Sequence, residues 1–359
     1  CRHQTFPLIP IFVSYCSKVM KILVTGGCGY IGAHTIVDLL ENGFEVICID
    51  DNSRSGTGLL RGAETIGGCS VPHYRVNLCN FEDTYRVFTQ HPQISGIIHF
   101  AAYKSVPESV ANPLLYYRNN LQSLVNLLQC VQEFRVPYFV FSSSCSVYGN
   151  AVHLPVTEET PLQKAESPYG NTKQIGEEII ADVARTSKDN FILLRYFNPV
   201  GAHPSGLIGE LQETPENLVP LITQTAIGKR PALTVFGNDY PTRDGSCLRD
   251  YIHVMDIANA HTKALQYLLE QKNTSNYEVF NLGSGNGVTV LEAIAAFEQV
   301  SGVALNYVIG PRRAGDVVAI YANNQKAAHL LGWHPRYSLA DMMRTAWQWQ
   351  LKLKASEAE

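Results

Sequence analysis

The sequence predicts an α/β fold in which a doubly wound parallel sheet precedes a smaller mixed α/β lobe toward the C-terminus. After Met20, short β-branched runs alternate with longer stretches of helical spacing. The runs are apolar on both faces, which is typical of parallel strands covered by helices on both sides. The segment "VTGGCGYIG" (24–32) directly follows the first run, where such sheets turn from strand into helix. Together these observations indicate a Rossmann-type domain.

The elements of this domain follow from the periodicity. The predicted strands are 21–25, 45–50, 96–102, 138–144 and 191–197. Helical spacing is found near 30–42, 112–134 and 168–186. Because helices separate consecutive strands, we expect the strands to run parallel.

The pattern changes after Asn198. Residues 198–217 are rich in glycine and proline and predict a long functional loop. Beyond the loop we expect strands near 232–237 and 277–284 and helices near 255–270, 289–300 and 338–353. We therefore assign 20–198 to the first domain, with returns from about 251–284, and 199–359 to the second lobe.

The first 19 residues, "CRHQTFPLIPIFVSYCSKV", stand apart from this pattern. We interpret 1–19 as a non-native or disordered leader outside the fold. A signal peptide is the alternative, but prolines interrupt its apolar part and no small-residue cleavage site precedes Met20.

Composition limits the classes of partner. Hydrophobic residues make up 45% of the chain and charged residues 17%, with a formal net charge of −4. Neither a basic stripe nor a run of five like charges is present, which argues against nucleic acid or an anionic membrane surface. No stretch reaches the roughly 18–20 apolar residues that a membrane span needs.

The nine cysteines are odd in number and form no Cys-x-x-Cys pair. Several, including Cys48 and Cys130, lie in apolar segments. We predict buried thiols in a reducing compartment, which favours a cytoplasmic location. His-x-Glu and His-Glu-x-x-His patterns are absent, so the sequence predicts no structural or catalytic metal.

A dinucleotide site is predicted at the first strand–helix junction. Gly26, Gly29 and Gly32 allow a tight turn, and the helix N-terminus then offers N–H groups to a pyrophosphate. The second strand ends in Asp50, whose carboxylate suits the adenosine ribose hydroxyls and repels a 2′-phosphate. We therefore predict NAD rather than NADP, with Arg54 as a counter-indication. The alternative is that the glycines serve only the turn.

The segment "SPYGNTKQIGEEII" (167–180) predicts a helix capped by Ser167 with Pro168 at its first position. Tyr169 and Lys173, four residues apart, share one helix face. A free tyrosine has a pKa of about 10, so a base useful near pH 7 needs a lowering of about 3 units, or about 4 kcal/mol. Lys173, the helix N-terminus and a positive nicotinamide ring together could supply it.

Ser144, at the end of an earlier strand, completes a candidate catalytic set with Tyr169 and Lys173. Ordinary strand-end hydrogen bonding and a chance Tyr–Lys pair are the alternatives. With the Gly-x-x-Gly-x-x-Gly turn, this set resembles the extended branch of the short-chain dehydrogenase/reductase superfamily. Over 20–350 the chain is similar to the UDP-glucose 4-epimerase (UDP-galactose 4-epimerase) family. The likeness is carried by "VTGGCGYIG", "HFAAYKSVPESVANPLLYYRNN", "FSSSCSVYG", "SPYGNTKQIGE", "LRYFNPVGAHPSG", "VFGNDYPTRDGSCLRDYIHVMD" and "RRAGDV".

The resemblance implies an NAD-dependent isomerase of galactose metabolism that interconverts UDP-galactose and UDP-glucose. Tightly bound NAD takes a hydride from sugar C4 while Tyr169 takes the hydroxyl proton, with Ser144 in the hydrogen-bond path. Lys173 holds the nicotinamide ribose and lowers the pKa of Tyr169. The 4-keto sugar then rotates and receives hydride and proton on its other face. The second lobe is implied to bind the UDP-sugar.

The resemblance also implies the residues of both sites. The implied cofactor contacts are Gly26, Gly29, Tyr30, Ile31, Gly32, Asp50, Asp51, Asn77, Leu78, Phe100, Ala101, Ala102, Lys104, Asn119, Tyr169, Lys173 and Tyr196. The implied substrate contacts are Lys104, Ser144, Tyr169, Asn198, Asn217, Leu218, Phe236, Arg249, Tyr251, Arg313, Asp316 and Ile320. Two positions depart from the family pattern: Asn77 stands for an aspartate and Asp51 for an asparagine. Both are expected to shift cofactor affinity without threatening the reaction.

Two other functions remain open. A nucleotide-sugar 4,6-dehydratase or decarboxylase shares the fold, but Cys145 and Ser146 beside Ser144 supply no carboxylate for elimination. A non-catalytic NAD-sensing protein is the alternative from another class, because fold alone does not fix function.

Substrate range and assembly are inferred by resemblance. Ile320 is expected on the sugar-pocket wall, and its size leaves open whether an N-acetylated sugar fits. The family implies a homodimer through 112–134 and 168–186. The apolar face with Leu121, Leu124 and Leu128 suits either that contact or the sheet.

Overall fold

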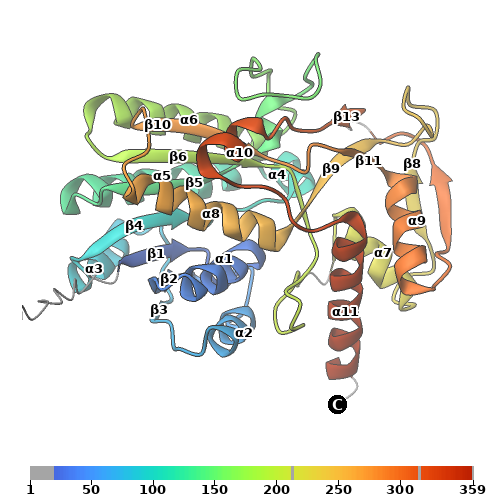
Figure 1. Ribbon diagram of the computed structural model, residues 1–359, viewed down its shortest axis with the longest axis horizontal. Helices are drawn as coiled ribbons and strands as arrows, with labels where there is room; N and C mark the ends of the chain where they lie inside the picture. The colour runs from blue at the N-terminus through green and yellow to red at the C-terminus, as the bar shows by residue number, and fades with distance from the viewer. Residues whose placement is uncertain (1–19, 212–213, 314–316, 358–359) are drawn as a thin grey trace, which may run out of the picture.

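The computed structural model describes residues 20–211, 214–313 and 317–357 (Figure 1). The predicted leader, 1–19, lies outside the described residues. Within them, no helix combines the length and apolarity needed to cross a bilayer.

A seven-stranded parallel sheet forms the larger part of the molecule, in the order β10-β6-β5-β4-β1-β2-β3. Its strands are β1 (Lys21–Thr25), β2 (Glu45–Ile49), β3 (His73–Tyr74), β4 (Ile94–His99), β5 (Tyr138–Ser144), β6 (Asn190–Tyr196) and β10 (Tyr277–Leu282). The strand order reverses between β1 and β4, and ligands of such sheets bind beyond the carboxyl ends at this reversal. The predicted doubly wound parallel sheet is confirmed.

Helices cover both faces of this sheet (Figure 1). One face carries α1 (Tyr30–Glu41), α2 (Gly58–Gly67), α8 (Val254–Leu269) and, packed on α8, α10 (Gln325–Leu331). The other carries α3 (Phe81–Gln90), α5 (Pro113–Phe134) and α6 (Pro168–Thr186), with α4 (Val106–Ala111) leading into α5. Alternate residues of β1 serve the two cores: Ile22 and Val24 pack in the cluster of α1 and α8, and Leu23 in that of α5 and α6.

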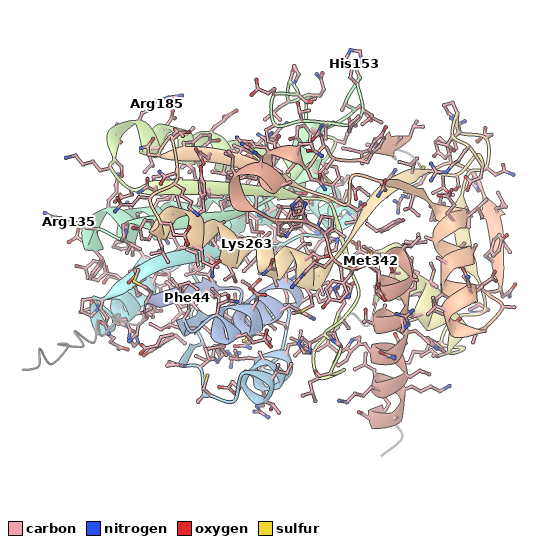
Figure 2. The ribbon with its side chains drawn as sticks, viewed as in Figure 1. Phe44, Arg135, His153, Arg185, Lys263 and Met342 are labelled. Carbon is pink, nitrogen blue, oxygen red and sulfur yellow. The ribbon has the colours of Figure 1, made fainter. Side chains whose placement is uncertain are left out.

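The directions of α5 and α6 place their first turns near the carboxyl ends of the strands. Arg135 directly follows α5, and Arg185 lies in the last turn of α6. Both arginines lie at the same end of the molecule, away from the second lobe (Figure 2). The N-terminal turns of the two helices therefore point toward the second lobe, where a ligand of the sheet would lie.

Among the described residues, the second lobe is built from short strands and three helices. β9 (Leu248–His253) is flanked by β7 (Asn198–Val200), β11 (Gly287–Thr289) and β13 (Ala319–Ile320), and β8 (Leu233–Phe236) pairs with β12 (Tyr307–Gly310). The helices are α7 (Leu218–Ala226), α9 (Val290–Ser301) and α11 (Leu339–Glu357). An apolar cluster holds them together and includes Phe297 of α9 and Met342 of α11, which Figure 2 labels.

Some expectations need adjustment. Residues 251–261, expected to return to the sheet, divide between β9 and α8 and add no strand to it; α8 packs against the first domain, and Ile252 of β9 belongs to the same core cluster as β1 and α1. Cys48 and Cys130 are buried as predicted, but Cys69 is exposed because it lies in the loop after α2. On α5, Leu124 and Leu128 are buried against the sheet.

Candidate active site

The carboxyl end of β5 presents the first candidate catalytic group. Ser144 ends this strand, pairs in register with Tyr196 of β6, and caps the short 3₁₀ helix η1 (Cys145–Tyr148). Its Oγ accepts the N–H of Ser146 at 3.2 Å.

The start of α6 brings Tyr169 and Lys173 to the same place. Ser167 caps the helix by accepting the Gly170 N–H at 3.1 Å, and Pro168 is the first helical residue, as predicted. Burial, the largest cause, raises the pKa of Tyr169, and nearby Tyr196 adds to this, whereas a hydrogen bond with Ser144 opposes it. The protein's own groups therefore keep that phenol protonated at neutral pH.

Lys173 lies one turn further along α6 and is buried. Its Nζ donates to the carbonyl of Ser142 at 2.7 Å and lies 4.8 Å from the centre of the Phe141 ring. Burial lowers the pKa of Lys173 to about 8, and the negative charge of Glu177 partly opposes that lowering. The ammonium is therefore largely charged near neutral pH but close to its titration range.

Ser142 contacts both Lys173 and Tyr196, although no motif singles it out. Its carbonyl accepts from Lys173, and its hydroxyl lies 2.5 Å from the hydroxyl of Tyr196. Burial raises the pKa of Tyr196 to about 12, so this tyrosine is a neutral neighbour of Tyr169.

The glycine turn lies at the end of β1. Gly26 has φ +71, and a Cβ there would come within 2.8 Å of the Ala101 nitrogen. A Cβ on Gly32 would come within 2.2 Å of the Gly26 carbonyl oxygen. Gly29 directly precedes α1 and provides no side-chain cap, so the first N–H groups of α1 are left for another acceptor. Tyr30, next along, donates its hydroxyl to the Gly201 carbonyl at 2.6 Å.

Asp50 follows β2 beside this turn. Its carboxylate accepts the N–H of Cys28 at 3.0 Å and that of Asn52 at 2.9 Å. Burial nevertheless raises the pKa of Asp50, because these two bonds only partly offset the loss of water. Arg54, the counter-indication for NAD, binds both oxygens of Glu108 at 2.8 and 3.0 Å and is thereby held in an ion pair.

The other predicted cofactor residues follow neighbouring strands or begin neighbouring helices. Ile31 lies in the first turn of α1, Asp51 follows Asp50, Asn77 and Leu78 follow β3, Phe100 to Ala102 follow β4, and Asn119 lies on α5. Asn120, which sequence reasoning missed, anchors this region: it exchanges hydrogen bonds with the backbone of Tyr103 and donates to Thr172 of α6 at 3.1 Å.

A cavity in the second lobe gathers most of the predicted substrate residues. It is lined by Asn198, Asn217, Leu218, Phe236, Arg249, Tyr251 and Arg313. The Arg313 guanidinium lies 5.3 Å from the centre of the Phe236 ring, and Arg249 Nη1 donates to the Val317 carbonyl at 2.6 Å. Glu216, Thr234 and Cys247 also line the cavity, and none of them was among the predicted site residues.

Besides Ser144 and Tyr169, two described residues of the predicted substrate set, Lys104 and Ile320, lie outside this lining. Lys104 reaches from the first domain to Glu210, 3.3 Å away, and Glu210 also accepts from Asn217 at 3.1 Å. Ile320 is buried beside Val147 of η1 rather than at the cavity surface. Asp316 lies outside the described residues.

Comparison with known proteins gives the family. Residues 23–346 match the family model described as GDP-mannose 4,6 dehydratase. The chain is 45% identical over 333 residues to UDP-glucose 4-epimerase of Bacillus subtilis (strain 168), covering 92% of this chain and 97% of that protein. UDP-glucose 4-epimerase 2 of Arabidopsis thaliana is 45% identical over 334 residues, or 92% of this chain and 94% of that one. The chain belongs to the UDP-glucose 4-epimerase family.

Solved members of the UDP-glucose 4-epimerase family share the fold over nearly their whole length. The enzyme of Stenotrophomonas maltophila, with bound NAD and formylated UDP-arabinopyranose, superposes with a TM-score of 0.91 at 42% identity, covering 94% of this chain and 99% of that one. The Bifidobacterium longum enzyme, in complex with NAD⁺ and UDP, gives a TM-score of 0.88 at 41% identity, with 93% and 98% covered. The expected UDP-glucose 4-epimerase family and its Rossmann-type fold are thereby confirmed.

Proposed function

We propose that this chain interconverts UDP-galactose and UDP-glucose, using bound NAD. The observation that carries the proposal is the convergence of Ser144, Tyr169 and Lys173 at the carboxyl end of the sheet. Family relatives named for this reaction, and related structures with NAD and with UDP or a UDP-sugar, support it.

The residues beyond the sheet fit NAD. At Gly26 and Gly32 any Cβ would clash with neighbouring backbone, so glycine keeps the turn as tight as a pyrophosphate cradle requires. Asp50 would accept the adenosine ribose hydroxyls, and Lys173 would hold the nicotinamide ribose. When bound, NAD supplies the acceptor, and later the donor, of the hydride at sugar C4.

Tyr169 would take the proton of the sugar 4-hydroxyl and return it after the sugar has turned. Ser144, which opposes the raised pKa of the phenol, would hold the sugar hydroxyl in line with it. The phenolate needs about 4 kcal/mol of stabilisation to form near pH 7. The charge of Lys173 and the N-terminus of α6 both favour the anion, and each acts more strongly in a buried site than in water.

The cavity of the second lobe would hold the end of the substrate that does not react. The planar forks of Arg249 and Arg313 suit a diphosphate, and Phe236 offers a ring to the uracil. Strong contacts at this end leave the hexose lightly held near Ser144 and Tyr169. An oxidised sugar could therefore rotate about its link to the diphosphate while the nucleotide stays bound.

The name of the matching family model raises the rival reaction, elimination of water. That reaction needs a proton donor beside the catalytic serine. Cys145 and Ser146 occupy the first turn of η1, and burial raises the pKa of Cys145, so neither offers a carboxylate or a ready proton. Epimerisation requires no such donor.

The purified chain incubated with UDP-galactose tests the proposal. We expect UDP-glucose to accumulate to a fixed equilibrium ratio, followed by proton magnetic resonance of the anomeric signals. A dehydratase would give a 4-keto-6-deoxy sugar instead, and an NAD-sensing protein would leave the substrate unchanged. Either result would overturn the proposal.

Three further proposals concern organisation. We propose that 20–198 with 251–284 holds NAD and that the rest of 199–359 holds the UDP-sugar.

We propose a homodimer formed through the outer faces of α5 and α6, which pack side by side and leave Leu121 partly exposed. Light scattering of the parent and of Leu121→Glu would test it, because a buried charge would dissociate the pair. The free thiols Cys28 and Cys48 support a reducing, cytoplasmic location.

The position of Ile320 bears on which UDP-sugars the chain would accept as substrates. We propose that this side chain, buried in one cluster with Val147 of η1 and outside the lining of the nucleotide cavity, limits the space near Ser144. We therefore propose a preference for hexoses without an N-acetyl group. Equal turnover of UDP-galactose and UDP-N-acetylgalactosamine would contradict this preference.

A further inference from the structure

Three soft-metal ligands meet beneath the glycine turn. Cys28 lies in the turn between β1 and α1, Cys48 on β2, and His73 on β3. Their ligand atoms all lie within 4.8 Å of one another. Both thiols are fully buried, whereas the histidine is partly exposed. Thiolate sulfur and imidazole nitrogen are the donors that zinc and similar thiophilic cations prefer.

The spacing of one sulfur–nitrogen pair among these atoms matches metal coordination. Zn–S bonds of about 2.3 Å and Zn–N bonds of about 2.0–2.1 Å at a tetrahedral angle place sulfur and nitrogen roughly 3.6 Å apart. Cys28 Sγ and His73 Nε2 are 3.6 Å apart. A cation could therefore enter between them with little movement of either side chain.

The backbone holds the three donors in place. Cys48 and His73 are paired in register on neighbouring strands, and the Cys48 N–H donates to the Pro72 carbonyl at 2.8 Å. The Cys28 N–H donates to Asp50 at 3.0 Å. The Cys48 sulfur lies directly against Gly27, where a Cβ would approach it within 2.6 Å. Such a fixed arrangement lowers the entropy cost of closing a coordination sphere.

We propose that Cys28, Cys48 and His73 bind a thiophilic divalent cation of the Zn²⁺ class, and that its binding weakens binding of the dinucleotide. Two thiol protons leave to water as two metal–sulfur bonds form, and no electron is transferred. Three protein ligands leave a fourth position open, which makes this an exchangeable site rather than a closed structural one. The prediction of no metal rested on local motifs, and this cluster spans three elements of the fold.

Cation binding should weaken NAD binding because the metal site and the expected NAD site share the glycine turn and Asp50. This inference rests on the proposed function. Cys28 belongs to the turn that would cradle the pyrophosphate, so coordination of its sulfur would fix that turn in one arrangement. Asp50 holds the Cys28 N–H and would hold the adenosine ribose, and it lies close enough to interact electrostatically with His73. A divalent cation beside His73 would draw the Asp50 carboxylate toward the open fourth position.

The experiment titrates the reduced full-length chain with Co²⁺ alone, with and without added NAD. We expect one equivalent to produce a thiolate-to-cobalt absorption band, which Zn²⁺ abolishes. Saturating NAD should raise the apparent dissociation constant for Co²⁺ by about tenfold or more, and by linkage Co²⁺ should weaken NAD equally.

Variants locate the site. Cys48→Ser and His73→Asn should each weaken Co²⁺ binding by at least about 100-fold, since loss of an outer partner alone costs 10- to 100-fold. Cys130→Ser, a buried thiol on the other face of the sheet, and Cys69→Ser, an exposed thiol, should leave the band unchanged. Circular dichroism would show that each variant is folded.

Distinct outcomes overturn distinct claims. Absence of the band without NAD, or its persistence in both Cys48→Ser and His73→Asn, overturns the metal site. Equal Co²⁺ affinity with and without NAD overturns the opposition. A chain that shows the full metal pattern but fails to convert UDP-galactose keeps the metal site and loses the proposed function.

Discussion

Arg195 of β6 and Glu177 of α6 form a buried, two-pronged ion pair behind the candidate catalytic groups. Arg195 Nε donates to Glu177 Oε1 at 2.9 Å and Nη2 to Oε2 at 2.5 Å, and Ser143 donates to the same Oε1 at 2.5 Å. Glu177 lies one turn beyond Lys173, and Ser143 directly precedes Ser144. The pair therefore fixes the helix that carries Tyr169 and Lys173 relative to the strand that carries Ser144.

Removing one partner of this ion pair should lower the free energy of unfolding strongly. Glu177→Ala leaves the Arg195 charge buried, with about 6% of its side chain exposed, so we expect a loss of roughly 3–5 kcal/mol in unfolding free energy. Urea unfolding measures it. Glu178→Ala, on the exposed side of the same helix, should change stability by less than about 0.5 kcal/mol. Similar losses in the two variants would show that the ion pair has no special role.

The phenol of Tyr169 should be required for turnover and dispensable for folding. In Tyr169→Phe the proton acceptor is gone, so we expect kcat to fall roughly 10²- to 10⁴-fold. Unfolding should stay within about 1 kcal/mol of the parent, because the ring is kept. Tyr85→Phe, which removes a hydroxyl on the surface of α3, is the matched control. Undiminished turnover in Tyr169→Phe would remove the phenol from the reaction.

The lowered pKa of Lys173 should make the free energy of unfolding increase with pH above about pH 8. Its pKa is about 8 when buried and 10.5 by default in the unfolded chain. Below pH 8 both states bind the proton, and the folded state bears the full cost of burying the charge. Between about pH 8 and 10.5 the folded state binds fewer protons, so this cost is relieved as pH rises. The total relief is about 3 kcal/mol.

A comparison with Lys173→Met isolates that effect. The methionine does not titrate, so its stability advantage over the parent should shrink by about 3 kcal/mol from pH 8 to 10.5. Turnover of the parent should fall over the same range, because the ammonium that stabilises the phenolate is lost. Urea midpoints and initial rates measured across this range check both statements. A constant difference between the two proteins would mean that Lys173 keeps its ordinary pKa.

The sequence predicts the core of the fold where local pattern is strong. The runs 21–25 and 138–144 match β1 and β5 residue for residue, because continuous β-branched and aromatic runs suit a strand buried on both faces. The helix at 168–186 matches α6, since a serine cap and a proline mark its start. By contrast, no element was expected at α2 or α3. These are short helices, and the sequence of α2 contains several glycines.

The contacts of the candidate site also divide into those that local sequence pattern predicts and those that it does not. Spacing places Gly26 beside Gly32, and Tyr169 beside Lys173, since each pair shares one turn or one helix. The family resemblance supplied the residues of the second-lobe cavity, but the contact of Lys104 with Glu210 joins residues 106 positions apart. The cluster of Cys28 with His73 likewise depends on the order of β1, β2 and β3 in the sheet. No local pattern carries such contacts, because tertiary packing alone creates them.

Arg313 should act on substrate binding rather than on chemistry. Arg313→Ala removes charge-assisted hydrogen bonds worth roughly 1.5–3 kcal/mol, so KM for UDP-galactose should rise roughly 10- to 150-fold. The value of kcat should change little, because the contact lies at the end of the substrate that does not react. Arg313→Lys should recover only part of the loss, since a lysine lacks the planar fork.

Arg312→Ala is the matched control for this prediction. The neighbouring Arg312 is bound to Asp239 at 2.7 Å and stacks on Tyr240 at 4.2 Å, and it does not line the cavity. Its removal should leave KM within about twofold of the parent, because an exposed ion pair of this kind contributes little. Steady-state kinetics of the three variants decide the matter. Equal KM values for Arg312→Ala and Arg313→Ala, or a loss confined to kcat, would mean that the diphosphate is bound elsewhere.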